Sequence, residues 1–338
     1  MGGLAIKNAF TRRYQKDEFE ALVPEVVAKA KDLFTDVHIT EAYFQKDSFG
    51  DMDVLCLVDK PIDVNIKDWI YEKFDSKEVV SNNSVYSFEY KELQIDFILT
   101  PLRNWETSKV YFSFNDLHNF IGKHAKKFGL KWGFKGLEYD YKIGDKKLGT
   151  INITKDYTKA LDFLGFDVER YNKGFETLED IFKFVIDSKY FNPFMYDLEQ
   201  YNKINRDRDK KRKTYQSFLK YLEPYKNQAL MDQWSDKNKK YHYFYKDKKV
   251  YLGLIDHYFP GFLEQYRELE KKEEKLVAIR AKFNGNILMD EFGLEGKELG
   301  QSISNFKASF ENNNEFEGYV LKNDVETILN EFKTRNKL

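Results

Sequence analysis

One stretch of this chain decides its fold, and it reads Gly50-Asp51-Met52-Asp53-Val54-Leu55-Cys56-Leu57-Val58. Its apolar and β-branched residues predict a strand. Side chains two positions apart leave the same face of a strand, which rises about 3.3 Å per residue, so Asp51 and Asp53 are expected side by side, about 6.5 Å apart at their Cα atoms. Two carboxylates this close repel each other unless a cation joins them. Because Mg²⁺ prefers carboxylate oxygens, the pair predicts a site for a hard divalent ion.

A third acidic residue extends this prediction. Residues 90–99 alternate as a strand does, with Leu93, Ile95 and Phe97 on one face and Asp96 on the other. Acidic residues are depleted in strands, so Asp96 calls for an explanation. If the two strands are neighbours, the three carboxylates form a cage for two ions about 3.5–4 Å apart, the arrangement used in phosphoryl transfer. The alternative is that all three are solvated acids on exposed strand faces.

Composition narrows the class of protein. The chain has 338 residues, of which 42% are hydrophobic, enough for two or three packed domains. Its 55 basic and 56 acidic residues nearly cancel, which excludes a uniformly basic nucleic-acid coat but allows local basic patches. A single cysteine, Cys56, excludes an internal disulfide framework and is expected to be buried. Because no apolar run is long enough to span a membrane and no signal peptide is recognisable, we expect a cytoplasmic protein.

The order of predicted elements indicates an α+β fold. A helix at 17–35, a short strand at 35–40, a helix at 64–74 and an antiparallel pair at 79–88 and 90–99 suggest a small mixed-sheet domain that ends near Pro101. Beyond Pro101 the pattern becomes helical, with helices expected at 115–128, 158–164, 178–188 and 260–279. We therefore expect a mixed-sheet domain at 1–110 followed by predominantly α-helical domains at 111–225 and 226–338.

The residues around the acidic pair resemble a known superfamily. The run from Lys46 to Leu55, Lys-Asp-Ser-Phe-Gly-Asp-Met-Asp-Val-Leu, is similar to the core motif of the DNA polymerase β-like nucleotidyltransferases. The resemblance implies a palm-like catalytic domain at 1–110 that uses two Mg²⁺ ions and a nucleoside triphosphate (NTP). It implies that Asp51 and Asp53 hold both ions. Asp96 would ligate the catalytic ion and activate the attacking hydroxyl.

The segment upstream of this motif departs from the superfamily. The family grips the triphosphate with a Gly-Ser turn, but this chain has Thr40-Glu41-Ala42 at the corresponding place. A glycine lets the backbone approach a phosphate closely, and Lys46 and Ser48 offer a charge and a hydroxyl. The local substitutes for the missing turn are therefore Lys46, Ser48 and the N–H groups of Phe49 or Gly50.

The rest of the chain carries a second resemblance. Residues 112–117, 129–137, 190–193 and 205–212 are similar to nucleotidyltransferase-like proteins common in bacteriophages. The resemblance implies a nucleotide- and RNA-binding role for 111–225, including Asn115, and places the protein in the host cytoplasm if it is phage-encoded. Residues 293–303 are similar to the tail of CCA-adding tRNA nucleotidyltransferases and poly(A) polymerases, which implies an RNA-binding tail at 226–338. Alternatively, this tail is an ordinary pair of helices joined by a glycine turn.

The densest charge run of the chain lies at 205–213, with six basic residues against two acidic ones. Such a run is the electrostatic footprint of nucleic-acid binding. Arg206, Arg208 or Arg212 would instead face the nucleotide, since a guanidinium group suits both phosphates and base edges. The alternative is a solvated helix face with internal ion pairs. The five histidines show no metal-ligand spacing and are expected to be structural.

These observations together predict a Mg²⁺-dependent nucleotidyltransferase. It would transfer a nucleoside monophosphate (NMP) from ATP or another NTP to a hydroxyl acceptor, with the 3′ end of an RNA such as tRNA as the expected acceptor. A second hypothesis is a catalytically degenerate relative that binds RNA, a nucleotide or a protein partner. In a third, the acceptor is a hydroxyl of a protein or small molecule, as in toxin-like members of the superfamily.

Overall fold

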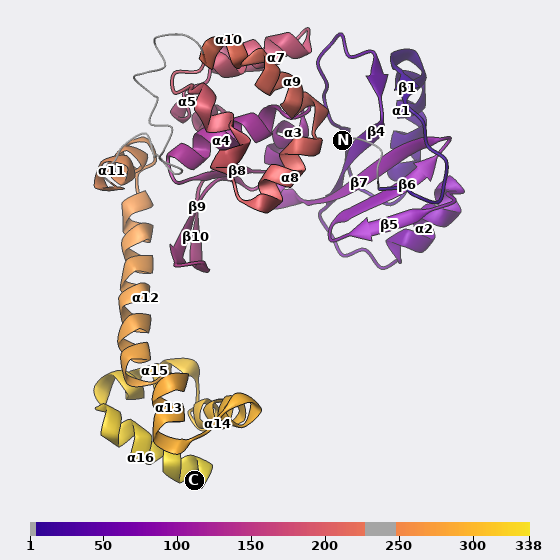
Figure 1. Ribbon diagram of the computed structural model, residues 1–338. Coiled ribbons are helices and arrows are strands. Elements are labelled where there is room, and N and C mark those ends of the chain that lie inside the picture. Colours follow the sequence, from indigo (N-terminus) through magenta and orange to yellow (C-terminus); the bar gives the residue numbers. More distant parts are fainter. Residues whose placement is uncertain (1–4, 227–247) are drawn as a thin grey trace. The chain divides into compact units, whose positions relative to one another are not determined.

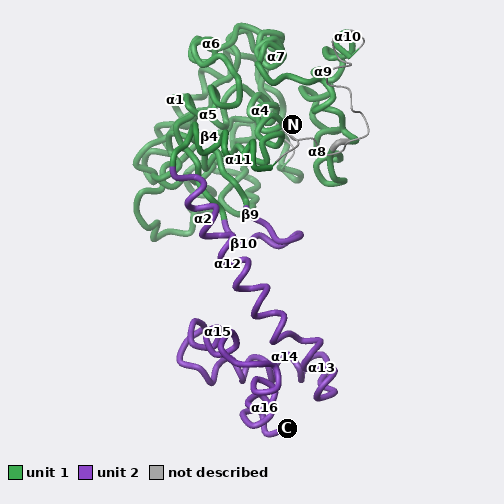
Figure 2. The backbone as a smooth tube through the Cα atoms, turned by 90° about the vertical axis from the view of Figure 1, so that its left-hand side faces the viewer, with its two compact units in different colours: residues 1–140, 150–260 green, residues 141–149, 261–338 purple. Residues whose placement is uncertain are grey.

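The protein has two compact units in a computed structural model that describes residues 5–226 and 248–338. The first comprises residues 1–140 and 150–260, and the second comprises residues 141–149 and 261–338 (Figure 2). The fold is mixed α/β, as the sequence predicted, with a mixed sheet and many helices. The domain boundaries expected near residues 110 and 225 do not coincide with this division and stay a prediction.

A five-stranded sheet organises the N-terminal part of the first unit (Figure 1). Its strands, in spatial order, are β2 (Val37–Ile39), β4 (Asp51–Val58), β7 (Leu93–Pro101), β6 (Val85–Tyr90) and β5 (Val79–Asn82). Strands β4 and β7 run parallel, and all the other neighbours are antiparallel. The sheet is therefore mixed, and its two central strands carry the acidic residues singled out from the sequence.

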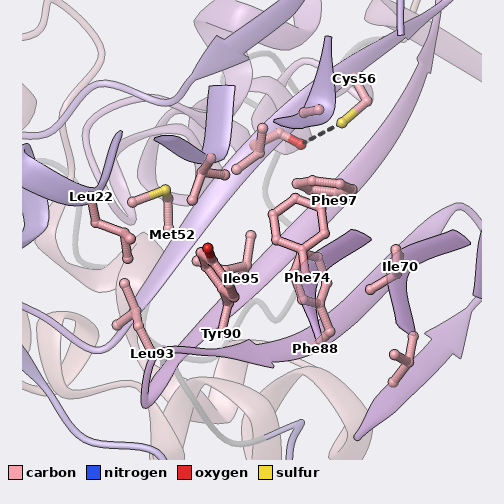
Figure 3. Close-up of a cluster of buried hydrophobic side chains, with 14 of the residues drawn as sticks. Leu22, Met52, Cys56, Ile70, Phe74, Phe88, Tyr90, Leu93, Ile95 and Phe97 are labelled. Atoms are coloured by element: carbon pink, nitrogen blue, oxygen red, sulfur yellow. Dashed lines mark hydrogen bonds between the residues drawn. The ribbon is translucent and has the colours of Figure 1, made fainter. Parts of the chain in front are cut away.

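One face of the sheet is buried under α1 (Lys16–Ala30) and α2 (Ile66–Phe74), as their shared core cluster shows. Alternation along β4 and β7 places Met52, Cys56, Ile95 and Phe97 on this face, all fully buried (Figure 3). The ring of Phe74 packs against Phe97, with centroids 5.5 Å apart. This burial supplies the apolar stabilisation that holds the strand register.

The opposite face of the sheet carries the side chains of β4 and β7 that alternate with those buried residues. Leu55 and Leu57 of β4 and Ile98 of β7 pack against Trp105. Trp105 begins α3 (Trp105–Phe112), which follows the short 3₁₀ turn η1 (Leu102–Asn104). Asp51, Asp53 and Asp96 belong to this same face because they lie two or four positions from those apolar residues. The helical part of the unit thus covers one end of the face that carries the acids.

A two-stranded ribbon flanks the start of β4. Strand β1 (Tyr14–Gln15) pairs antiparallel with β3 (Ser48–Phe49), so that Tyr14 lies opposite Phe49. Phe49 stacks on Phe19 of α1, with ring centroids 3.9 Å apart. The ribbon therefore ties the chain segment before α1 to the residues directly before Asp51.

Helices form most of the remaining first unit. They are α4 (Leu117–Lys127), α5 (Tyr157–Phe163), α6 (Val168–Asn172), α7 (Leu178–Ile186), η2 (Pro193–Tyr196), η3 (Leu198–Gln200), α8 (Lys203–Lys211), α9 (Lys213–Tyr221), α10 (Glu223–Lys226) and α11 (Lys248–Tyr258). The helices expected at 115–128, 158–164 and 178–188 are confirmed as α4, α5 and α7.

The strands differ from the sequence predictions in two places. Residues 79–88 are not one strand, because a turn with Asn83 in the left-handed region (φ 52°) separates β5 from β6. The part after Pro101, expected to be predominantly helical, also contains a three-stranded sheet that the sequence analysis did not predict, formed by β8 (Lys131–Gly133), β9 (Gly136–Ile143) and β10 (Lys146–Thr154). Tyr and Ile alternation on both sides of Gly144 was the available signal for β9 and β10.

The second unit is built on α12 (Phe262–Lys282), which confirms the long helix expected at 260–279. Its other helices are α13 (Gly285–Phe292), α14 (Gly296–Ala308), α15 (Asn313–Lys322) and α16 (Val325–Asn336). Phe283, Phe306 and Phe332 meet in its apolar core. In the described part of the chain, no helix is both long and apolar enough to cross a membrane.

Candidate functional site

The three acids predicted from the sequence converge. Parallel pairing of β4 with β7 puts Asp53 directly opposite Asp96, and Asp51 lies two residues earlier on β4. One carboxylate oxygen from each residue lies within 4.8 Å of the other two. Among residues 5–226 and 248–338 they form the only group of three or more His, Cys, Asp or Glu side chains that could hold a metal ion. An all-oxygen donor set favours a hard cation such as Mg²⁺.

The electrostatics of this cluster favour binding of a cation. Burial raises the pKa of Asp53 well above its usual range, and the charges of Asp51 and Asp96 raise it further. Burial also raises the pKa of Asp96 to about 6, although hydrogen bonds from Ser87 and Gln94 act in the opposite direction. Three half-buried carboxylates therefore cannot all be ionised at neutral pH without cost, and a divalent ion would remove that cost.

Two neighbours hold Asp96 in place. The side-chain amide of Gln94 donates to both Asp96 oxygens, at 2.9 Å and 3.0 Å. Its carbonyl accepts from the backbone N–H of Ala5 at 2.9 Å, and this contact determines which way the amide points. Ser87 lies opposite Asp96 on β6. The sequence analysis identified neither residue. Gln94 could have been found because it shares a strand face with Asp96, whereas the position of Ser87 depends on the register between β6 and β7.

Lys46, which the sequence singled out, lies beside the carboxylates. The charges of Asp51 and Asp53 raise its pKa, but burial has the larger effect and lowers it. Its ammonium lies 4.4 Å from the centroid of the Phe49 ring and 3.4 Å from Oδ1 of Asn115. Two of the predicted nucleotide-binding residues, one from each side of the unit, thus meet near the acidic cluster.

Asn115 occupies a strained turn between α3 and α4. It and Phe114 both have φ of 58°, in the left-handed region that costs non-glycine residues about 1–3 kcal/mol each. Phe114 is buried, and its ring packs edge-on against Tyr171 and Phe175. Its N–H donates to the carbonyl of Glu41 at 2.7 Å. The surroundings therefore hold the strained turn, and the turn presents Asn115 to Lys46.

The segment that replaces the Gly-Ser turn is engaged with the protein itself. The N–H of Thr40 donates to the carbonyl of Asp53 at 3.2 Å. The N–H of Glu41 donates to Oγ of Ser113 at 3.3 Å. The backbone at 40–41 therefore has these two donors committed to intramolecular hydrogen bonds.

Ser48, Phe49 and Gly50 lead directly into the acidic strand. Phe49 is buried, whereas Ser48 and Gly50 are half-buried. Oγ and the carbonyl oxygen of Ser48 both accept from the guanidinium of Arg13, at 3.1 Å and 2.8 Å. Arg13 is therefore a further residue near the site, which the sequence reasoning missed because it precedes the motif by more than thirty residues.

The charge run at 205–213 forms α8 and the start of α9, and part of it is structural. Lys123 and Asp209 form a buried ion pair of 2.8 Å between α4 and α8. Burial lowers the pKa of Lys123 to about 8, although Asp209 acts to raise it. For Asp209, burial is the largest single effect and raises the pKa, but the hydrogen bonds and charges of Lys123 and Arg208 together lower it below its usual value. This pair docks the charged helix onto α4.

The three predicted arginines have different surroundings. Arg208 donates to Oδ1 of Asn119 at 3.2 Å, and Arg212 pairs with Asp116. The backbone N–H of Arg206 donates to the carbonyl of Asn202 at 2.9 Å, whereas no hydrogen bond or ion pair joins its guanidinium to another residue of the described ranges. Arg208 and Arg212 therefore contact the start of α4, directly after Asn115, the residue that contacts Lys46. No hydrogen bond or ion pair joins these arginines to Asp53 or Asp96 within the described ranges.

His118 and His124, both on α4, are buried and internally bonded. Trp132 donates to Nδ1 of His118 at 2.9 Å, which leaves the proton on Nε2, 3.0 Å from the Tyr171 hydroxyl. Burial lowers the pKa of both histidines to about 3, so both are neutral. These contacts agree with the structural role expected for them.

Two depressions mark the surface. One of about 280 Å³ lies beside the site between the start of α1 and the residues before β3; Gln15, Lys16, Asp17, Gln45, Lys46 and Asp47 line it. The other, of about 550 Å³, lies in the second unit at the start of α13, with Arg280 and Lys307 on its rim. Comparison of the chain with models of protein families and with curated proteins finds no match.

Proposed function

We propose that the protein is a Mg²⁺-dependent nucleotidyltransferase with a palm-like catalytic domain. It transfers NMP from an NTP to a hydroxyl acceptor, for which we favour the 3′ end of an RNA such as tRNA. The observation that carries the proposal is the convergence of Asp51, Asp53 and Asp96 from two parallel central strands, with carboxylate oxygens within 4.8 Å of one another. The DxD motif and its flank, which resemble the polymerase β-like superfamily, support the same reading.

Each residue has a role in this proposal. Asp51 and Asp53 hold both ions, and Asp96 ligates the catalytic one. When bound, two Mg²⁺ ions neutralise charge on the triphosphate and lower the pKa of the attacking hydroxyl. Gln94 and Ser87 keep Asp96 in its orientation, since one lies beside it on β7 and the other opposite it on β6. The enzyme supplies positioning and charge neutralisation rather than a covalent step.

The test is direct. The protein is incubated with each labelled NTP, Mg²⁺ and total RNA, and a denaturing gel shows whether RNA becomes labelled. The Asp96→Asn variant, which keeps the size of the side chain, serves as the inactive control. Label on protein rather than RNA would move the acceptor to a protein hydroxyl. Absence of label on any acceptor, with every NTP, would contradict the proposal.

A second candidate function rests on the backbone at 40–41. Because Thr40 and Glu41 have committed their N–H groups, the usual triphosphate grip is absent. A relative without catalysis, which binds RNA, a nucleotide or a protein partner, is the alternative that this observation favours. A ligand that binds only the folded state raises the melting temperature. No shift at millimolar Mg²⁺-NTP would favour this alternative.

A further inference from the structure

Two neighbouring arginines before α1 have opposite environments. Arg12 pairs with Glu18 at 2.8 Å and with Glu92 at 3.0 Å, and its guanidinium lies over the Tyr14 ring. Arg13 pairs with no carboxylate among the described residues; its contacts are the two neutral oxygens of Ser48. The charge of Arg12 is thus neutralised by two carboxylates. The guanidinium of Arg13 is held in a fixed orientation by Ser48, but its charge is not neutralised by these neutral oxygens.

The position of Arg13 is set by the β1–β3 ribbon. Tyr14 pairs with Phe49 and Gln15 with Ser48, so the residue before Tyr14 reaches the strand that leads into Asp51. Three hydrogen bonds of 2.8–3.3 Å hold its guanidinium on Ser48. The Arg13 side chain remains exposed. A planar, oriented and exposed guanidinium is suited to binding a phosphate oxygen.

A second cation lies next to it. The ammonium of Lys46 lies 4.4 Å from the ring centroid of Phe49, the residue that follows the Ser48 on which Arg13 is held. Two neighbouring cations repel each other until an anion joins them, which is the reverse of the situation in the acidic cluster. The two clusters lie side by side, one suited to cations and the other to an anion.

We propose that Arg13 and Lys46 bind the phosphate groups of the nucleotide, in place of the committed backbone amides of Thr40 and Glu41. This inference deepens the proposed function and rests on it for the identity of the ligand. Arg13 is the phosphate-binding residue, and Ser48 is a positioning residue that holds its guanidinium. Asn115, through its contact with Lys46, holds the second cation.

Binding of Mg²⁺-tripolyphosphate tests this inference without requiring activity. Isothermal titration would compare the wild-type chain with Arg13→Ala, Arg13→Lys, Ser48→Ala and the matched control Arg12→Ala. We expect Arg13→Ala to weaken binding about 10- to 100-fold, because it removes a charge-assisted hydrogen bond. Arg13→Lys should restore part of the affinity, Ser48→Ala should weaken it less than Arg13→Ala, and Arg12→Ala should leave it within about 2-fold, since Arg12 is already neutralised.

The outcomes separate the two proposals. If the wild type binds tripolyphosphate and Arg13→Ala does not, the phosphate site stands even when no NTP is incorporated, and only the proposed activity fails. Unchanged affinity in Arg13→Ala, or no binding by the wild type, overturns the inference. Melting temperatures of all variants show that each is folded. If the wild type incorporates NMP, Arg13→Ala should raise the KM for NTP with little change in kcat, whereas a purely structural role would change both.

Discussion

Two groups of charged side chains withdrawn from solvent in the first unit differ in the signs of the charges that they bring together. Lys123 and Asp209 are both buried, but they are of opposite sign and lie 2.8 Å apart. Asp51, Asp53 and Asp96 are also withdrawn from solvent, but they carry the same sign and their oxygens lie within 4.8 Å. The first group satisfies itself and holds α8 on α4. The second keeps a net repulsion, because Lys46 and the hydrogen bonds from Ser87 and Gln94 offset only part of it, and a divalent ion would relieve the rest.

This contrast separates a structural charge cluster from a functional one. The charge run at 205–213 is the densest in the sequence, but Asp209 in that run is committed to packing. The acidic cluster has only three residues, but the repulsion between them lowers the stability of the fold. That cost indicates a function, namely binding of a cation. Four predictions test the contrast, in order of decreasing effect.

The largest expected effect is on catalysis. Asp51→Ala or Asp96→Ala should lower NMP incorporation by at least about 1000-fold, because the ions they hold supply several kcal/mol of charge stabilisation in the transition state. The measurement is labelled-NTP incorporation, with circular dichroism to show that each variant is folded. Retained activity in either variant would remove the acidic cluster from the mechanism.

The structural pair should behave in the opposite way. Asp209→Ala leaves the Lys123 charge buried without its partner and should destabilise the fold by about 3–5 kcal/mol. The double variant Lys123→Met/Asp209→Leu should recover much of this loss, because neither charge remains. Chemical denaturation measures both. A double variant as unstable as the single one would mean that the pair does not act as a unit.

Removal of one charge from the acidic cluster should stabilise the metal-free protein. Asp53→Asn relieves the repulsion with Asp51 and Asp96, which we expect to raise the free energy of unfolding in EDTA by roughly 1–2 kcal/mol. The same variant should lose the stabilisation that Mg²⁺ gives to the wild type. Thermal melts with and without Mg²⁺ measure both effects. A lower melting temperature in EDTA would contradict the repulsion.

The smallest effect is a pH dependence. The pKa of Asp96 is about 6 in the folded protein, above its unfolded value, so the folded state favours the protonated form. The stability it contributes is fully present below about pH 4 and is lost as the pH rises through about 6. Comparison of wild type with Asp96→Asn in EDTA at pH 4–7 isolates this slope. Parallel curves for the two proteins would show that Asp96 is not responsible.

Much of the site could be predicted because it depends on local periodicity. Alternation along residues 50–58 and 90–99 was enough to place Met52 and Phe97 inside and the acids on the other face. Burial of Cys56 was predicted from the general preference of a free cysteine for the protein interior, and the residue is fully buried. The split of residues 79–88 was missed because β5 has only four residues and gives weak periodicity. The sheet at 131–154 was missed although β9 and β10 alternate on both sides of Gly144.

Other parts of the site depend on contacts between distant segments. Arg13 reaches Ser48 only because β1 pairs with β3, and Ser87 reaches Asp96 only because β6 pairs with β7. The expected RNA-binding tail is a related case. Its helix α14 begins at Gly296. Residues 261–338 carry 12 basic and 15 acidic residues, so RNA binding there would require a local cluster of basic side chains rather than an overall positive charge.

The sequence by itself determined that Asp51 and Asp53 share one strand face and that Asp96 lies on the polar face of another, because side-chain direction alternates with a period of two in any strand. Only the tertiary structure decided that β4 and β7 are parallel neighbours in the register that sets Asp53 against Asp96. That register comes from burial of the apolar face under α1 and α2, since a slip of one residue would turn every apolar side chain to the wrong side. Tertiary contacts likewise set Arg13 on Ser48 and Asn115 beside Lys46, because the members of these pairs lie 35 and 69 positions apart in the sequence.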